Sequence, residues 1–76
     1  MQANVTFMFE KRTTVIQCTM KEEMQKIFEK FDQKIYSNLD DFNFFYENNI
    51  VNGDSTFLEL TNDENINNII ITAEKK

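Results

Sequence analysis

The sequence predicts an α+β fold in which one main amphipathic helix packs on one face of a mixed sheet of four to five strands. Three observations support this. Apolar and polar residues alternate in several short segments, as in half-buried strands. Between two of these segments, apolar residues recur at helical spacing. The chain has 76 residues, of which 41% are hydrophobic and 13% aromatic, enough for one packed core. We therefore expect a single domain over residues 1–76.

Two strands are expected first, over residues 5–9 and 14–20. Each alternates between apolar and polar side chains, and the polar link between them is short enough for a tight turn. We therefore expect a hairpin. The side chains predicted to face its core are Val5, Phe7 and Phe9 from the first strand and Ile16, Cys18 and Met20 from the second.

The helix is expected over residues 21–36. Thr19 and Glu22 have the spacing of a capping box, which predicts that the helix begins beside them. A loop over residues 37–41 should follow, with Leu39 turned inward. The apolar residues that share one helical face are Met24, Ile27, Phe28, Phe31 and Ile35.

The second half predicts shorter elements. Residues 42–46 form a strand in which Asn43 and Phe45 face away from Phe42, Phe44 and Tyr46. Ile50 and Val51 can begin a short strand, and Phe57, Leu58 and Leu60 fit a single helical turn. The last strand is expected over residues 67–72, followed by a polar tail. Three consecutive isoleucines leave its phase open, with either Ile70 or the pair Ile69 and Ile71 facing outward.

The order of these elements limits the topology. A hairpin followed by one amphipathic helix packs that helix on a sheet face. Right-handed crossovers then allow the first and last strands to pair in parallel at the sheet centre. This is a β-grasp arrangement.

Over residues 5–72 the pattern of apolar positions resembles the ubiquitin-like family, and the small ubiquitin-like modifiers (SUMO-like proteins) most closely. Residues 42–49 read Phe-Asn-Phe-Phe-Tyr-Glu-Asn-Asn. They resemble the family's third strand and turn, which commonly reads Leu-Arg-Phe-Leu-Phe-Glu-Gly-Gln. The spacing from there through Val51, Thr56 and Leu60 to Ile69 also agrees. The resemblance implies a ubiquitin-like β-grasp domain.

The sequence departs from that family at two places. Family modifiers end in Gly-Gly for conjugation, whereas no glycine follows Gly53 here, so we expect a non-conjugated domain. The same feature argues against sulfur-carrier proteins of this fold. Gln17 and Thr19 stand where the modifiers carry basic residues along their peptide groove, so recognition of the modifiers' usual partner motif is not expected.

Composition excludes several classes of function. There is no histidine and only one cysteine, so a histidine base, a zinc cluster and an internal disulfide are excluded. We expect no enzymatic activity, no cofactor, no metal and no small-molecule substrate. The net charge of -5 argues against nucleic acid as a partner. No apolar run approaches the ~20 residues of a membrane span. The single cysteine and the absence of a secretory signal pattern predict an intracellular protein, cytoplasmic or nuclear.

The main candidate site is the sheet face opposite the helix. Alternation predicts that Met8, Val15, Phe45 and Ile70 point outward there. Phe45 falls where the resemblance places the central residue of a hydrophobic recognition patch. Exposed apolar patches often mark interaction sites. The alternative is that the tail or neighbouring side chains cover Phe45.

Three weaker candidates remain. An acidic set in the second half faintly resembles a segment that some β-grasp domains use to bind a like domain. A lysine stripe at i, i+4, i+8 can contact an acidic partner, although such stripes usually face solvent. Cys18 is predicted to be a small core residue. The acidic residues are Glu47, Asp54, Glu59, Asp63 and Glu64, and the lysines are Lys26, Lys30 and Lys34.

The sequence therefore predicts a non-catalytic protein-interaction module that docks a partner around Phe45. The alternative from another class is a small permanent structural subunit of a larger assembly. A conjugated modifier is less favoured, because Gly-Gly is absent from the end of this sequence.

Overall fold

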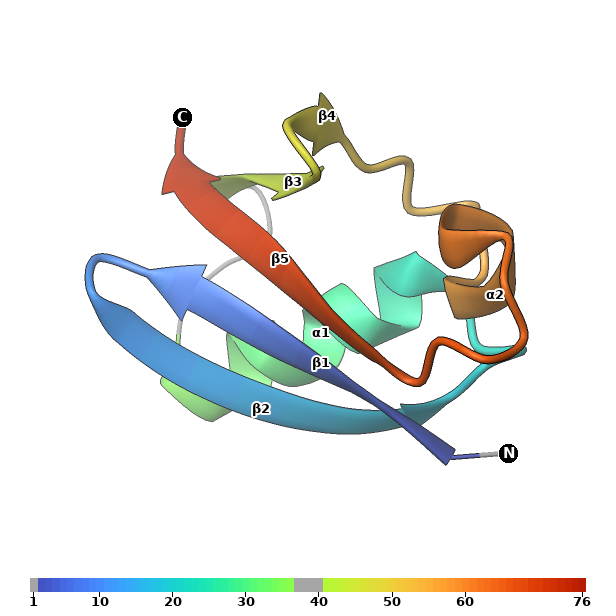
Figure 1. Cartoon of the computed structure of the whole chain (residues 1–76). Helices are drawn as coiled ribbons and strands as arrows, with labels where there is room; N and C mark the ends of the chain where they lie inside the picture. The colour runs from blue at the N-terminus through green and yellow to red at the C-terminus, as the bar shows by residue number, and fades with distance from the viewer. Residues whose placement is uncertain (1, 37–40) are drawn as a thin grey trace.

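The computed structural model describes residues 2–36 and 41–76. Figure 1 shows the strands wrapping around the main helix, with the second, short helix at one end of the sheet. The predicted Leu39 and most of its loop lie outside the described residues. In chain order the elements are β1 (Gln2–Phe9), β2 (Arg12–Thr19), α1 (Met24–Ile35), β3 (Phe42–Tyr46), β4 (Asn49–Ile50), α2 (Phe57–Thr61) and β5 (Asn68–Lys75).

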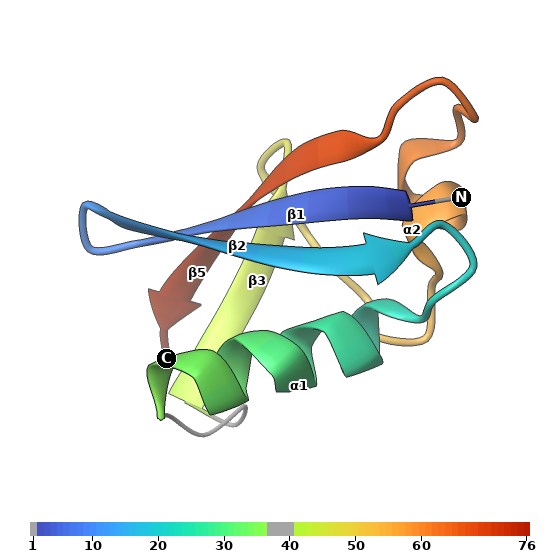
Figure 2. The same ribbon diagram turned by 90° about the horizontal axis from the view of Figure 1, so that it is seen from below.

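The five strands form one mixed sheet in the order β2-β1-β5-β3-β4. The central strands β1 and β5 run parallel, and the other neighbouring pairs are antiparallel. Helix α1 lies across one side of this sheet (Figure 2). The predicted α+β fold, with the first and last strands paired at the sheet centre, is confirmed.

The core between the sheet and α1 is largely aromatic. Phe7 of β1 stacks on Phe31 of α1 with ring centroids 4.3 Å apart. Phe28 of α1 stacks on Phe44 of β3 at 4.0 Å. Such pairs contribute about 0.5–1.5 kcal/mol each beyond the burial of their surface. The stacks fix the face on which α1 sits, and so they also fix which sheet face stays open.

The phase of β5 is now settled. Ile69 and Ile71 are buried, whereas Ile70 is exposed. The register explains this, because Ile71 lies beside the buried Phe7 of β1 and Ile70 lies beside Thr6 on the other face.

Helix α1 begins at Met24, later than predicted, and no side chain caps it. Its first amide groups donate to a distant loop: Met24 N–H to the Ser55 carbonyl at 2.7 Å and Gln25 N–H to the Gly53 carbonyl at 2.9 Å. The predicted capping box at Thr19 is therefore wrong. Instead, Thr19 N–H donates to Glu22 Oε1 at 3.3 Å in the turn before the helix.

A capping box is present at α2. The Thr56 hydroxyl accepts from Glu59 N–H at 3.1 Å, and Glu59 Oε1 accepts from Thr56 N–H at 2.9 Å. This exchange satisfies two amide groups at the helix start, which stabilises a helix of a single turn.

The segment predicted to be a polar tail is part of the sheet. Strand β5 continues to Lys75, and Ala73 is buried opposite Phe44 of β3. The pairing explains the difference, because β3 needs hydrogen-bonding partners along its whole length and residues 72–75 supply them.

No helix in the described parts of the chain is long and apolar enough to cross a membrane.

Candidate functional site

The candidate site is the outer face, by which we mean the sheet face opposite α1. Strand register sets its residues in rows that cross the strands. One row is Val15–Thr6–Ile70, from β2, β1 and β5. The next is Thr13–Met8–Thr72–Phe45–Ile50, which crosses all five strands.

The structure brings the four predicted residues together on this face. Met8 is 42% exposed, Val15 49% and Ile70 57%. Phe45 is outward as well, because both neighbours in its strand, Phe44 and Tyr46, pack on the core side. We call Met8, Val15, Phe45, Ile50 and Ile70 the outer patch.

Phe45 points outward as predicted, but its ring is only partly exposed. It lies between Thr72 of β5 and Ile50 of β4, its direct register partners. Because β5 and β4 pair with β3 at this position, the ring has a paired strand on both sides. The alternative in which neighbouring side chains cover Phe45 is therefore correct in part.

Ile50 belongs to the outer patch and was not predicted there. At 66% it is the most exposed aliphatic residue of the patch. Strand β4 contains only Asn49 and Ile50. Two residues are too few to show an alternating pattern, so the sequence carries no periodic signal for the face that Ile50 occupies.

The centre of the outer face is free of charge. Beside the two rows above lies a third, Gln17–Asn4–Asn68. None of the residues in the three rows is charged, whereas 28% of the whole chain is charged. Depletion of charged residues, more than apolar content alone, distinguishes the centre of protein interfaces from other surface.

An open hollow of about 650 Å³ borders the outer patch. Thr6, Ile70 and Thr72 line it from the sheet, and Glu47 and Asn48 from the turn between β3 and β4. It therefore gives the outer face a concave side next to Ile70.

The acidic candidates do not gather in one site. Glu47 lies in the β3–β4 turn, whereas Glu59 lies on α2. The carboxylate of Glu59 is held by the capping box, and Asp63 Oδ1 accepts from Asn65 N–H at 2.9 Å in a local turn. The carboxylates of Glu59 and Asp63 therefore stabilise the local backbone through these hydrogen bonds.

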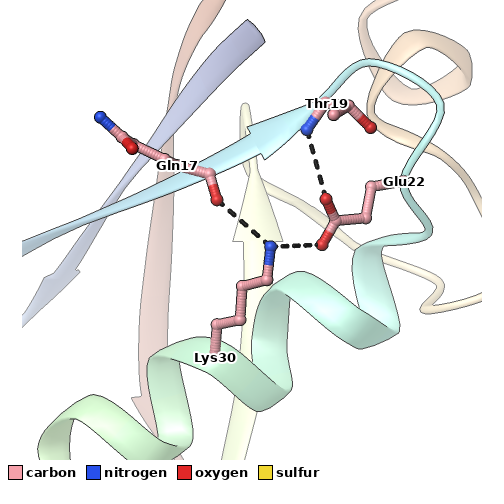
Figure 3. Close-up of polar contacts among 4 residues, drawn as sticks. All are labelled: Gln17, Thr19, Glu22 and Lys30. Carbon is pink, nitrogen blue, oxygen red and sulfur yellow. Dashed lines mark hydrogen bonds and ion pairs between the residues drawn. The ribbon is translucent and has the colours of Figure 1, made fainter.

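Two of the three stripe lysines reach the sheet. Lys30 Nζ lies 2.6 Å from Glu22 Oε2 and donates to the Gln17 carbonyl at 3.3 Å (Figure 3). Lys34 Nζ donates to the Val15 carbonyl at 3.2 Å. The stripe is therefore partly engaged with β2, which the helical spacing alone did not predict.

Cys18 is buried in the core, as predicted. Burial raises the pKa of its thiol to about 11, and the charge of Glu22 adds to the effect. The thiol is therefore protonated at neutral pH and poorly nucleophilic. Among the residues that the structure describes, no group of three or more Cys, Asp or Glu side chains is arranged to hold a metal ion.

No family model matches the sequence, and no curated protein matches it. Solved structures are similar in fold. Ubiquitin from Caldiarchaeum subterraneum has a TM-score of 0.83 and 6% identity, covering 99% of this chain and 94% of its own. A de novo protein based on ubiquitin has a TM-score of 0.80 and 10% identity, covering 99% and 89%. ATBAG1, in its crystal structure with HSP70, has a TM-score of 0.81 and 7% identity, covering 97% of this chain and 40% of that chain. Together with the strand order, these similarities establish that the chain has the α+β ubiquitin-like β-grasp fold.

Proposed function

We propose that this ubiquitin-like domain is a non-catalytic protein-interaction module. It docks a partner on the outer face around Phe45, with Met8, Val15 and Ile70 as flanking anchors and Ile50 extending the contact. The observation that carries the proposal is the set of charge-free rows in which these residues stand.

The composition of the outer patch supports a protein partner. Its aliphatic side chains gain about 25 cal/mol for each Å² of apolar surface removed from water, before the costs of association. Met8 adds an unbranched side chain that adapts to different partner surfaces. A net charge of -5 opposes binding to nucleic acid or to an anionic membrane surface. ATBAG1, of which 40% of the chain is similar in fold, is described in complex with HSP70, in keeping with a protein partner here.

The dimensions of the outer patch favour an elongated partner segment. Val15 on β2 and Ile50 on β4 are separated by four strand spacings, which is about 19 Å. The two rows that carry the patch are about 7 Å apart along the strands. A helix is about 10–12 Å wide, and about 13 residues span 19 Å. The apolar stripe of one helix laid across the strands therefore fits the patch.

Two finer points belong to the same proposal. Within the ubiquitin-like fold we place the chain closest to the small ubiquitin-like modifiers, because of the spacing from the third strand to Ile69. We also place it inside the cell, in the cytoplasm or nucleus, because its single cysteine is buried and forms no disulfide.

The proposal is tested by a tagged pull-down from native cells, with proteins identified by mass spectrometry. The variants are wild type, Phe45→Ala and Tyr36→Ala. Tyr36 is 96% exposed at the end of α1, so its replacement removes an exposed aromatic ring away from the outer face. The expected result is a partner held by wild type and Tyr36→Ala but lost by Phe45→Ala.

Two other results would contradict the proposal. Recovery of the same large set of proteins with all three variants would indicate a permanent structural subunit held by other surfaces. A ladder of covalent higher-mass bands would indicate a conjugated modifier.

A further inference from the structure

Strand β2 forms one edge of the sheet, whereas β4 at the other edge has only two residues. Residues 13–19 of β2 read Thr-Thr-Val-Ile-Gln-Cys-Thr, with no charge, no proline and no glycine. A segment of this length and composition has the signature of strands that pair with copies of themselves. An edge strand also presents unpaired backbone groups to solvent. Strand β2 therefore combines a self-pairing sequence with an open edge.

The backbone groups that face this edge can be identified. Asn4 N–H donates to the Asn67 carbonyl at 2.8 Å, toward β5. Because alternate residues of a strand direct their backbone groups to opposite sides, Val5 of β1 faces β2 and bonds its register partner Ile16. The backbone groups of the neighbouring Val15 and Gln17 then point away from the sheet, into the open edge.

Side chains from α1 and from the turn before it form hydrogen bonds with the backbone groups at this edge of β2. Lys34 Nζ donates to the Val15 carbonyl and Lys30 Nζ to the Gln17 carbonyl. Further along the edge, the carboxylate of Glu22 accepts from Thr19 N–H and holds Lys30 in an ion pair. Figure 3 shows the contacts that Glu22 and Lys30 make with the end of β2.

The occupied groups are the ones that pairing between two copies of β2 would need. Consider two copies of β2 paired antiparallel, with Ile16 of one copy opposite Ile16 of the other. Residues 13–19 of one copy then lie opposite residues 19–13 of the other. Val15 of one copy then faces Gln17 of the other, and the two exchange both backbone hydrogen bonds. This exchange uses the Val15 and Gln17 carbonyls, which Lys34 and Lys30 now hold.

We propose that the β2 edge is an association surface for a second copy of this chain, held closed by Lys30 and Lys34. The two ammonium groups take the carbonyls that strand pairing requires. They also place like charges on both sides of any β2–β2 contact. Loss of their charge opens the edge, and the chain then dimerises through an antiparallel β2–β2 ladder. The contact uses backbone groups at the edge of β2 and not the side chains of the outer face, so it does not depend on partner docking there.

The test measures molar mass in solution by light scattering over a range of protein concentrations. The variant K30Q/K34Q removes both ammonium groups. The control K21Q/K26Q makes the same change in net charge. Neither Lys21 nor Lys26 makes a side-chain hydrogen bond or ion pair within residues 2–36 and 41–76. We expect K30Q/K34Q to double its mass as concentration rises, while wild type and the control stay monomeric. A monomeric K30Q/K34Q, or equal dimerisation of the control, would overturn the proposal.

Two further variants locate the contact. K34Q alone keeps the ion pair of Lys30 with Glu22 and should dimerise more weakly than K30Q/K34Q. Adding Gln17→Pro to K30Q/K34Q removes an outward N–H without touching the ladder to β1, a position where edge strands tolerate proline. It should restore the monomer. Persistence of the dimer in the triple variant would show that it forms elsewhere.

Discussion

Phe45 and Ile50 lie directly opposite each other in the antiparallel ladder of β3 and β4, with their side chains on the face that α1 leaves open. The same row continues through Thr72 to Met8. The row therefore runs from Ile50 at the sheet edge through Phe45 to the central strands, and it contains no charged residue. This continuity makes the outer face one surface.

Replacement of Phe7 by alanine should mainly lower stability, whereas replacement of Phe45 should mainly weaken partner binding. Phe7 is fully buried between Phe31 and Phe44, so Phe7→Ala should cost about 3–5 kcal/mol. The total stability expected for 76 residues is roughly 4–11 kcal/mol. Phe45→Ala should cost much less and weaken partner binding instead. Thermal melts followed by circular dichroism measure the difference, and equal losses of stability would show that the two faces are wrongly assigned.

The hairpin between β1 and β2 should be stabilised by a better turn sequence. Glu10 and Lys11 form its two-residue turn with φ values of 50° and 70°, at which the Cβ atom of a Glu or Lys residue crowds the following carbonyl oxygen. Asn-Gly is preferred in such turns. We expect E10N/K11G to raise the free energy of unfolding by about 1 kcal/mol in urea denaturation. The control E10Q/K11Q makes the same charge changes and should show no such gain.

The two Thr-x-x-Glu sequences should respond differently to mutation. Thr56→Ala removes the hydroxyl that accepts from Glu59 N–H and should cost about 1 kcal/mol. Thr19→Ala leaves the bond from its own N–H to Glu22 in place and should cost only a few tenths of that, about 0.3 kcal/mol. Chemical denaturation of both variants measures this. Equal costs would contradict the cap assignments.

Cys18 should make stability depend on alkaline pH. Its thiol has a folded-state pKa of about 11, against an ordinary value of 9.0. Between these values the folded chain keeps a proton that the unfolded chain releases, so the free energy of unfolding falls as pH rises. Urea denaturation from pH about 8 to about 11 should show this fall, and Cys18→Ala should reduce its slope. The pKa of Tyr46 is also raised, chiefly by burial, and this contribution persists in both proteins. An unchanged slope in Cys18→Ala would contradict the raised thiol pKa.

The fold and most of the outer face were predictable, because both depend on short-range periodicity. Alternation along β1 and β3 assigns Met8 and Phe45 to one face, and helical spacing assigns Phe28 and Phe31 to the core side of α1. The structure confirms these orientations. Whether the outward residues bind a partner stays a prediction.

The features that were missed depend on contacts distant in the sequence. The start of α1 is set by the carbonyls of Gly53 and Ser55, about 30 residues away, so no local pattern near Thr19 could show it. Phe45 is flanked by its register partners Thr72 of β5 and Ile50 of β4, and the pairing with β5 joins residues 27 positions apart. The lysines at the edge of β2 are placed by the packing of α1 on the sheet, which helical spacing does not specify.

The central claim, that the outer face is the docking surface, is tested most directly by site-specific photo-crosslinking in cells. A photoreactive amino acid is placed at Ile70, which is exposed on the central strand β5, or at Glu29, which is exposed on α1. We predict a covalent adduct with one partner from position 70 and none from position 29, and loss of the adduct when Phe45→Ala is added. An adduct from position 29 alone, or one from position 70 that survives Phe45→Ala, would contradict the claim.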